Sequence, residues 1–437
     1  MDKITFTIDG QKITADKGMT ILEAALENGI YIPHLCYHPD LEPAGVCRLC
    51  MIEIEKRGLF TSCNTPAEPE IAVRTETPEI EKVRRVTAEL LILNHPFDCL
   101  ICEKNTNCEL QKIARFIGID EEHINKMRKP ERILPIDTSN PFFIYDPNRC
   151  VLCGICVRTC RNTVSVSALD FVDRGYNSIV STFGNKPMLE SRCVSCGECV
   201  ARCPVGSLKP KETPIPSREI KTTCPYCGVG CGLILGSRGD KIVSSRGDIE
   251  NPINKGQLCV KGRFGHEFIN HPERLTTPLT KKDGLFVETS WDEALDLIAD
   301  KFSHYNGDQF ASLSSAKCTN EENYIMQKFT RAVMGTNTID HCARLCHAPS
   351  VAGLAQSFGS GAMTNSINEI QYTKSIFAIG TNTTSAHPVI AYKIKNAVKE
   401  GSKLIVPNPK EIDLCEFADI FFRYSYIHSL SPEGRVI

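Results

Sequence analysis

The cysteines constrain this chain more than any other feature, because 23 of them occur in 437 residues and most stand in short groups of regular spacing. The amino terminus has no apolar signal core, and no run of apolar residues approaches the ~18 that a membrane span needs. We therefore expect a cytoplasmic protein with no membrane span. Disulfides are rare in that compartment, so this many thiols predict metal or redox chemistry.

The charge balance restricts the partners that the chain can have. Fifty Lys and Arg residues stand against 52 Asp and Glu residues, for a formal net charge of −2. This balance gives no basic field to attract nucleic acid, so we expect no nucleic-acid partner. With 42% apolar and 23% charged residues the composition is that of a folded protein, and the length allows several domains.

The first cysteine group follows a short β-hairpin and a helix. Apolar residues alternate from Ile4 to Ile13 around a turn at Asp9-Gly10, and a helical pattern covers 20–26. Four cysteines follow with ten, two and twelve residues between them: Cys36, Cys47, Cys50 and Cys63. The order resembles the β-grasp ferredoxin module of the large iron-sulfur subunit of respiratory complex I and of iron hydrogenases, which implies a [2Fe-2S] cluster. A structural zinc site is the alternative, although two short Cys-x-x-Cys arms usually close such sites.

A histidine accompanies the second group. Residues 78–95 predict an amphipathic helix that begins at Pro78. Its apolar side is expected to hold Val83, Val86, Leu90, Leu91 and Leu93. The helix leads to His95, Cys99, Cys102 and Cys108, a spacing that resembles the His-ligated [4Fe-4S] site of the same two families. By itself His95 would be an ordinary core or surface histidine, and its offset from three cysteines favours a ligand.

The third group occurs twice with the same spacing, Cys-x2-Cys-x2-Cys-x3-Cys. The two runs are Cys150, Cys153, Cys156, Cys160 and Cys193, Cys196, Cys199, Cys203. This double run is the two-cluster bacterial ferredoxin signature, in which the fourth cysteine of each run binds the other cluster. One [4Fe-4S] cluster is thus expected on Cys150, Cys153, Cys156 and Cys203, and a second on Cys193, Cys196, Cys199 and Cys160. A zinc site is a much weaker alternative.

The last group follows a Pro-rich linker at 210–216. Its members are Cys224, Cys227, Cys231 and, after 27 intervening residues, Cys259. The spacing alone also fits a zinc knuckle, but the segment from Leu258 to Arg263 resembles the amino-terminal [4Fe-4S] domain of molybdopterin oxidoreductases. The resemblance implies that Lys261 lies between the cluster and a pterin and couples them electronically. An exposed surface lysine is the alternative.

Four cysteines remain, and one of them has an informative context. The run from His341 to Leu354 resembles the active-site segment of formate dehydrogenases, where the position of Cys346 binds molybdenum or tungsten and a histidine, here His347, follows. By this resemblance the hydrogen of formate leaves as hydride or as a proton, and His347 receives or relays the proton. Cys318, Cys342 and Cys415 are expected to be small buried residues.

An α/β pattern surrounds the Cys346 segment. Strands are expected at 310–314, 375–379 and 403–406, and helices from 319 and at 388–400. Ligands sit at the carboxyl ends of parallel strands. The family resemblance then implies that Gly380, Asn382 and Asn408 contact the guanine dinucleotide of a bis-molybdopterin cofactor, while a generic α/β core is the alternative.

Together these patterns predict an α+β multidomain chain that resembles the catalytic subunit of molybdopterin-dependent formate dehydrogenases. The resemblance implies oxidation of formate to CO2 or the reverse, with electrons carried over one [2Fe-2S] and four [4Fe-4S] clusters to a flavin and NAD(H) subunit, a ferredoxin or hydrogenase subunits. The expected domains are 1–77 (β-grasp), 78–138 (His/Cys3), 139–209 (two-cluster ferredoxin), 217–275 (molybdopterin-type [4Fe-4S]) and 276–437 (partial molybdopterin α/β domain).

The likeness ends near residue 420, whereas family members continue for several hundred residues. The expectation is a catalytic subunit that is truncated relative to the family, either cut short by a frameshift or completed at its pterin site by a second chain. The alternative is a non-catalytic iron-sulfur subunit that transfers electrons in a complex I-like or hydrogenase-type assembly.

Overall fold

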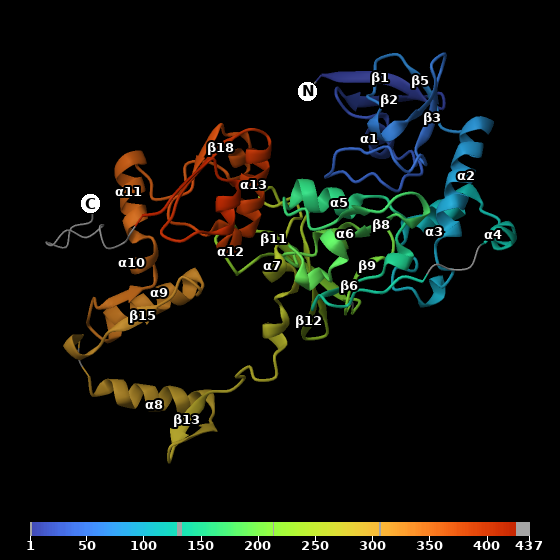
Figure 1. The fold of residues 1–437 in the computed structure, drawn as a ribbon. Coiled ribbons are helices and arrows are strands. Elements are labelled where there is room, and N and C mark those ends of the chain that lie inside the picture. The colour runs from blue at the N-terminus through green and yellow to red at the C-terminus, as the bar shows by residue number, and fades with distance from the viewer. Residues whose placement is uncertain (1, 129–132, 213, 306, 425–437) are drawn as a thin grey trace. The chain divides into compact units, whose positions relative to one another are not determined.

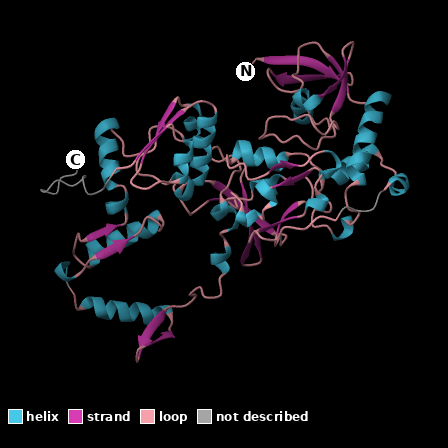
Figure 2. Cartoon of the chain, in the orientation of Figure 1, coloured by secondary structure: helices cyan, strands magenta, loops and turns pink. Residues whose placement is uncertain are grey.

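The structure is a computed structural model that describes residues 2–128, 133–212, 214–305 and 307–424. It divides into two compact units (Figure 1). The first unit holds residues 1–224, 231–266 and 373–437, and the second holds 225–230 and 267–372. Helices and short strands alternate along the chain (Figure 2), and the expected α+β multidomain architecture is confirmed. No helix in the described ranges is both long and apolar enough to cross a membrane.

The first unit begins with a five-stranded sheet in the order β2-β1-β5-β3-β4. Strand β1 pairs antiparallel with β2 and parallel with β5, which is the mixed pairing of a β-grasp. The hairpin turn at Asp9-Gly10 is confirmed, and both residues have positive φ. The strands are β1 (Lys3–Ile8), β2 (Gln11–Asp16), β3 (Met51–Ile54), β4 (Gly58–Thr61) and β5 (Ala72–Arg74).

Helix α1 (Ile21–Glu27) shares a core with this sheet. Thr20 and Glu23 form a capping box, in which each side chain binds the other's backbone N–H, so the expected start of the helix is confirmed. Ile21 and Leu22 pack with Phe6 and Ile52, and all four are almost fully buried. The amino-terminal domain thus has a core of its own.

Helix α2 (Pro78–Leu93) begins at the predicted proline but buries only part of the side that was expected. Leu91 and Leu93 pack against the core as expected, whereas Val86 and Leu90 are exposed, so the prediction was wrong for these two. The fully buried positions are Ile80, Arg84, Ala88 and Ile92, and Arg84 donates to the carbonyls of Leu49 and Met51. Helices α3 (Glu109–Ile117) and α4 (Glu121–Met127) follow.

The residues that pack against α2 extend into the two-cluster region, so one core serves both. Buried members include Ile92, Ile113, Phe143, Cys153 and Cys203. Strand β6 pairs with β9 and strand β7 with β8, while two short helices follow the cysteine turns. The elements are β6 (Phe143–Tyr145), α5 (Ile155–Arg158), β7 (Asp170–Val172), β8 (Ile179–Ser181), α6 (Glu198–Arg202) and β9 (Leu208–Pro210).

The rest of the first unit contains two further sheets. Three antiparallel strands, β10 (Arg218–Thr223), β11 (Gly232–Arg238) and β12 (Lys241–Gly247), precede helix α7 (Val260–Phe264). Three parallel strands, in the order β17-β18-β19, form the other sheet. Helices α12 and α13 connect β17 to β18, so the expected βαβ unit is confirmed. Their bounds are β17 (Ser375–Phe377), α12 (Thr383–Ala386), α13 (Pro388–Lys399), β18 (Lys403–Pro407) and β19 (Ile420–Phe422).

The second unit is more open. Between 267 and 372 the buried residues, among those described, are Ser312, Thr330 and Met334. The expected helix from 319 is confirmed, with Thr319 and Glu322 as its capping box. The elements are β13 (Leu279–Lys282), β14 (Leu285–Glu288), α8 (Trp291–Ser303), β15 (Ser312–Ser314), α9 (Asn320–Lys328), β16 (Ile339–His341), α10 (Ala343–Cys346) and α11 (Ala348–Phe358).

Single turns complete the described secondary structure. The 3-10 turns are Ser62–Asn64, Cys99–Ile101, Pro147–Arg149, Gly175–Asn177, Phe183–Asn185, Met188–Glu190, Glu267–Asn270, Gly307–Gln309, Ile367–Tyr372 and Asp413–Phe417. Two π turns, Thr159–Thr163 and Phe329–Val333, extend α5 and α9.

Candidate metal centres

The four residues of the His/Cys3 group line one cavity: His95, Cys99, Cys102 and Cys108. Burial lowers the pKa of His95 to about 4, so at neutral pH its imidazole is uncharged, which is the form that binds a metal. The buried Nδ1 atom of His95 has no hydrogen-bond partner among the described residues. A buried polar nitrogen without a partner is costly, and an iron atom in the cavity would satisfy it. These residues therefore fit a cluster.

Arg149 lies at the same cavity and was missed in the sequence. Its guanidinium forms a fork with the carboxylate of Asp98, and its Nε donates to Asp146 Oδ2 at 3.1 Å. Because Arg149 directly precedes Cys150, one residue connects the His/Cys3 group to the first ferredoxin run. The lone arginine had no spacing signal that could have identified it.

The two ferredoxin runs have the same backbone conformation. Leu152 and Ser195 both have positive φ (53° and 54°), and so do Gly154 and Gly197 (70° and 72°). Short helices begin directly after the two glycines. Positive φ is uncommon for a residue with a side chain, so its repetition at matching positions shows that both runs form the same tight loop.

The loops direct backbone N–H groups at the sulfur atoms. Leu152 N donates to Cys150 Sγ at 3.4 Å, and Ser195 N donates to Cys193 Sγ at the same distance. Ala168 N donates to Cys160 Sγ at 3.2 Å. Such bonds stabilise thiolates and tune the potential of the clusters they hold, so the loops fit iron-sulfur clusters.

The structure brings each run's fourth cysteine to the other run. Cys160 lines a cavity together with Cys193, Cys196 and Cys199. Burial, and then the thiols of Cys153, Cys150 and Cys203, raise the pKa of Cys156 well above its usual value, which places these four together. Burial also raises the pKa of Cys153 and of Cys196 to about 12. The thiols would therefore release protons on binding iron.

The four cysteines of the amino-terminal group are all buried and form two pairs. A hydrogen bond from Cys47 lowers the pKa of Cys36 to about 5, and one from Cys63 lowers that of Cys50 to about 7. Two cysteine pairs suit a [2Fe-2S] cluster. Gly45 has φ of 63°, and a Cβ there would lie 2.9 Å from Asn64 Nδ2, so the loop needs glycine.

The last group is only partly brought together. Cys224 N donates to Cys231 O at 2.8 Å, and a Cβ on Gly262 of α7 would lie 3.6 Å from Cys224 Sγ. Cys259 is half-buried and Lys261 is exposed on α7. Cys227 belongs to the second unit, so the fourfold grouping stays a prediction.

Cys346 ends helix α10 and His347 precedes α11, and both side chains are exposed. Cys318 and Cys342 are exposed too, and Cys415 is half-buried, so the expectation of three buried thiols was wrong. Cys318 and Cys342 lie in the unit whose described part buries almost nothing, which is why small apolar residues there remain accessible.

The predicted pterin contacts meet at the carboxyl ends of β17 and β18. Asn408 Nδ2 donates to Thr381 O at 2.8 Å, and Gly380 N donates to Pro407 O at 3.0 Å. Asn408 is buried, whereas Gly380 and Asn382 are exposed. The amide of Asn408 thus positions the two loops, and Gly380 and Asn382 are accessible to a ligand at the carboxyl ends of these strands.

Within the described residues, no group of three or more His, Cys, Asp or Glu side chains is arranged to hold a single metal ion. Clusters make a different demand, because their cysteines bind different iron atoms around a shared core. The cavities beside the His/Cys3 group and beside Cys160 meet that demand.

Five known domain families match successive parts of the chain. The fold and these matches show that the chain consists of iron-sulfur domains followed by part of a molybdopterin oxidoreductase domain, as the motifs predicted. The matches are a 2Fe-2S iron-sulfur cluster binding domain (1–78), the NADH-ubiquinone oxidoreductase-G iron-sulfur binding region (84–123), a 4Fe-4S dicluster domain (149–207), the molybdopterin oxidoreductase Fe4S4 domain (217–271) and molybdopterin oxidoreductase (274–426).

Similar proteins extend over nearly the whole chain. "Probable oxidoreductase YjgC" of Bacillus subtilis is 34% identical over 96% of this chain and 47% of its own length. "Putative formate dehydrogenase YrhE" of the same species is 33% identical over 96% of this chain and 48% of its own. The chain thus spans about half the length of these relatives. A solved NAD+-reducing [NiFe]-hydrogenase in the H2-reduced state has a TM-score of 0.45 and 35% identity, with 49% of this chain and 90% of that chain covered.

Proposed function

We propose that this chain is the iron-sulfur and metal-ligand part of a formate dehydrogenase. It would take part in the oxidation of formate to CO2 or in the reverse reaction, and would pass the two electrons to a flavin and NAD(H) subunit, a ferredoxin or a hydrogenase subunit. A molybdenum or tungsten bis-molybdopterin guanine dinucleotide would supply the formate chemistry when bound.

The observation that carries this proposal is the gathering of cysteines from distant runs into separate groups. Cys160 shares a cavity with cysteines more than thirty residues later, and His95 shares another with three cysteines. Free thiols at every predicted ligand position, with N–H groups directed at three of the sulfurs, support one [2Fe-2S] and four [4Fe-4S] clusters. Relatives with "formate dehydrogenase" in their names support the substrate.

The residues of this chain would have separate tasks. Cys346 would bind the molybdenum or tungsten as a soft thiolate, and His347 would hold or move the proton. Lys261, exposed on α7 two residues after Cys259, would couple the pterin to the nearest cluster. Gly380, Asn382 and Asn408 would contact the dinucleotide at the ends of β17 and β18.

A non-catalytic electron-transfer subunit is the second candidate. The exposure of Cys346 and His347 favours it, because a site that excludes water needs a cover over these residues. In this case the clusters would load with iron, but the chain would bind neither molybdenum nor tungsten in its native complex.

Metal analysis of the native complex distinguishes the two candidates. The enzyme should contain molybdenum or tungsten, about 18 irons for this chain if all five clusters are present, and should reduce viologen with formate. Cys346→Ser should abolish viologen reduction and leave the iron content unchanged. Cys342→Ser is the matched control, because it removes another exposed thiol of the same segment and should keep the activity. Iron without either metal would establish the electron-transfer candidate.

A further inference from the structure

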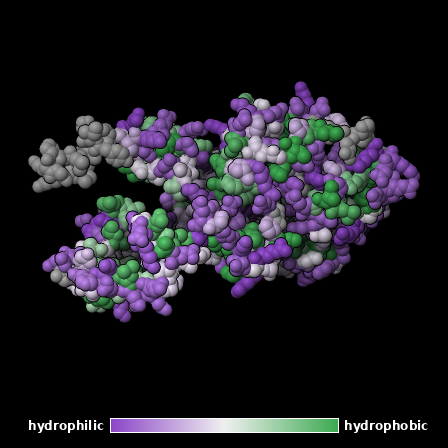
Figure 3. Space-filling model, turned by 90° about the horizontal axis from the view of Figure 1, so that it is seen from below, coloured by the Kyte–Doolittle hydropathy of each residue, from purple (hydrophilic) through white to green (hydrophobic). Residues whose placement is uncertain are grey.

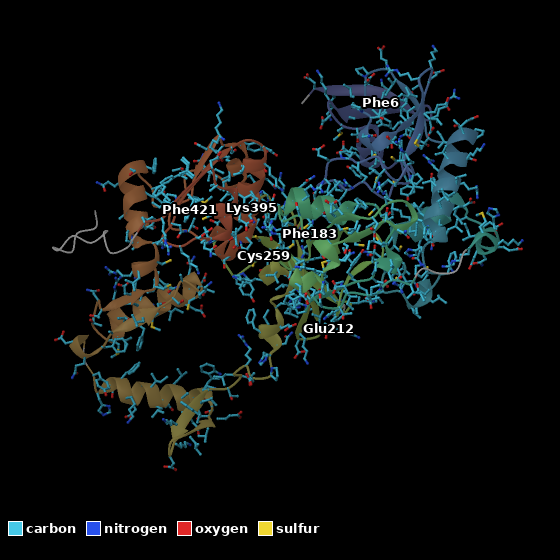
Figure 4. All side chains as sticks on the ribbon, viewed as in Figure 1. Phe6, Phe183, Glu212, Cys259, Lys395 and Phe421 are labelled. Atoms are coloured by element: carbon cyan, nitrogen blue, oxygen red, sulfur yellow. The ribbon has the colours of Figure 1, made fainter. Side chains whose placement is uncertain are left out.

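Arg263 on α7 is bonded to the backbone of two predicted ligands from different clusters. Its backbone N donates to Cys259 O at 3.1 Å. Its side-chain Nε donates to Cys196 O at 2.9 Å, and the side chain is only 8% exposed. Figure 4 labels Cys259, which directly precedes α7 in the first unit. A single residue therefore links the loop of the second ferredoxin cluster to the loop of the molybdopterin-type cluster.

Glu198 completes the link from the other side. It stands between Cys196 and Cys199 in the sequence, and its side chain is 1% exposed. Its Oε1 accepts from Leu258 N at 2.8 Å and from the guanidinium of Arg263, and its Oε2 accepts from Arg202. Buried charges are retained only when paired in this way, so the carboxylate and Arg263 stabilise one another.

The loop of Cys196 packs closely against α7, which follows Cys259. A Cβ on Gly197 would lie 2.5 Å from Arg263 Cδ and 2.8 Å from the ring of Phe264. Phe264 stacks on Phe142 with ring centres 4.8 Å apart and an interplanar angle of 7°. These contacts hold the loop of Cys196 closely against α7, so the separation between Cys196 and Cys259 depends on them.

We propose that Arg263 and Glu198 are the positioning residues of the electron-transfer junction between these two clusters. Arg263 fixes the distance between the loops, and the two buried charges set how easily the adjacent clusters are reduced. One electron is lost by the cluster on the Cys259 loop and gained by the cluster on the Cys196 loop, or the reverse. The inference rests on the proposed function, because it takes both clusters as present.

The opposite charges of Arg263 and Glu198 allow a test based on the direction in which the reduction potentials of the two clusters change. Reduction adds a negative charge to a cluster, so the positive Arg263 favours it and the negative Glu198 opposes it. Removing Arg263's charge should make both adjacent clusters harder to reduce, and removing Glu198's charge should make them easier to reduce. If both residues had a purely structural role, the two substitutions would not shift the reduction potentials in opposite directions.

The experiment is a redox titration of the iron-loaded full chain, followed by EPR, with Arg263→Gln and Glu198→Gln. We expect opposite shifts of about tenfold in the reduction equilibrium, which is ~59 mV for one electron. Arg84→Gln is the matched control. Arg84 is equally buried, but it donates to carbonyls beside Cys50, so this variant should leave the two junction clusters unchanged.

Arg263→Lys keeps the charge but lacks the Nε that bonds Cys196 O. Its potentials should stay close to those of the unaltered chain, while the magnetic interaction between the two reduced clusters should weaken. Shifts of the same sign in both Gln variants, or no shift at full iron content, would overturn the inference but not the proposed function. If the unaltered chain binds no iron at these cysteines, both proposals fail, and iron analysis detects that case directly.

Discussion

The iron-sulfur part of the chain, up to residue 266, and the segment 267–372 differ in what they bury. The first has two cores, and predicted ligands such as Cys36, Cys153 and Cys203 are members of them. The second exposes Trp291, Leu295 and Ile298 along one side of α8. Apolar side chains are visible on the surface among polar ones (Figure 3). The comparison teaches that the cluster domains are complete as packed units, whereas 267–372 presents apolar faces that further protein would have to cover.

Iron removal should have the largest effect on the difference between the two regions. Because the predicted ligand cysteines are part of the core, stripping iron with a chelator should loosen residues 139–209, since the free energy of metal binding contributes to folding. We expect proteases to cleave this region at least about tenfold faster without iron. Mass spectrometry of the fragments would locate the cuts.

The segment 267–372 is the internal control for that experiment. It buries almost nothing in the described structure, so its cleavage should be fast with or without iron. Equal protection of 139–209 before and after chelation would contradict the role of the cysteines as core ligands.

Matched isoleucine substitutions should sharpen the contrast. Ile80 on α2 is fully buried, so Ile80→Ala should lower the free energy of unfolding by about 2–5 kcal/mol. Ile298 on α8 is 46% exposed, and Ile298→Ala should change it by no more than about 0.5 kcal/mol. Urea denaturation followed by circular dichroism measures both.

Leu90→Ala tests the face of α2 directly. Leu90 was expected on the apolar side, but it is 59% exposed, so this substitution should be nearly neutral. A loss as large as that of Ile80→Ala would show that the helix buries the face expected from the sequence.

The helix caps should have a smaller effect than the buried isoleucine. Thr20 opens α1 with a capping box, and Ser290 opens α8 with a capping box of the same kind. Replacing such a cap with alanine lowers the free energy of unfolding by about 1 kcal/mol. Thr20→Ala should lower the stability of the whole amino-terminal domain, because α1 is part of its core. Ser290→Ala should reduce hydrogen-exchange protection only within α8.

Serine at position 20 provides the control for that comparison. Thr20→Ser keeps the hydroxyl that accepts from Glu23 N and should retain the stability. Global destabilisation by Ser290→Ala would mean that α8 is coupled to a larger packed unit.

Local patterns predicted well because neighbouring residues create them. The helix starts near Thr20 and Thr319 and the proline that opens α2 were predicted and are confirmed, because each start depends on contacts within one helical turn, such as the two capping boxes. The buried side of α2 followed its apolar pattern only in part. Arg84 lies on that side and donates to the carbonyls of Leu49 and Met51, more than thirty residues away, a contact that the local pattern could not indicate.

The sequence by itself determined the cysteine groups, their order along the chain and the family they resemble, because ligand spacing within a loop follows from backbone geometry. The tertiary structure decided which charges are buried and where they meet. Arg149 at the His/Cys3 cavity, and the pair of Glu198 and Arg263 between two cysteine loops, carry no spacing signal. Their roles depend on contacts between segments far apart in the chain, and burial makes those contacts strong by excluding water.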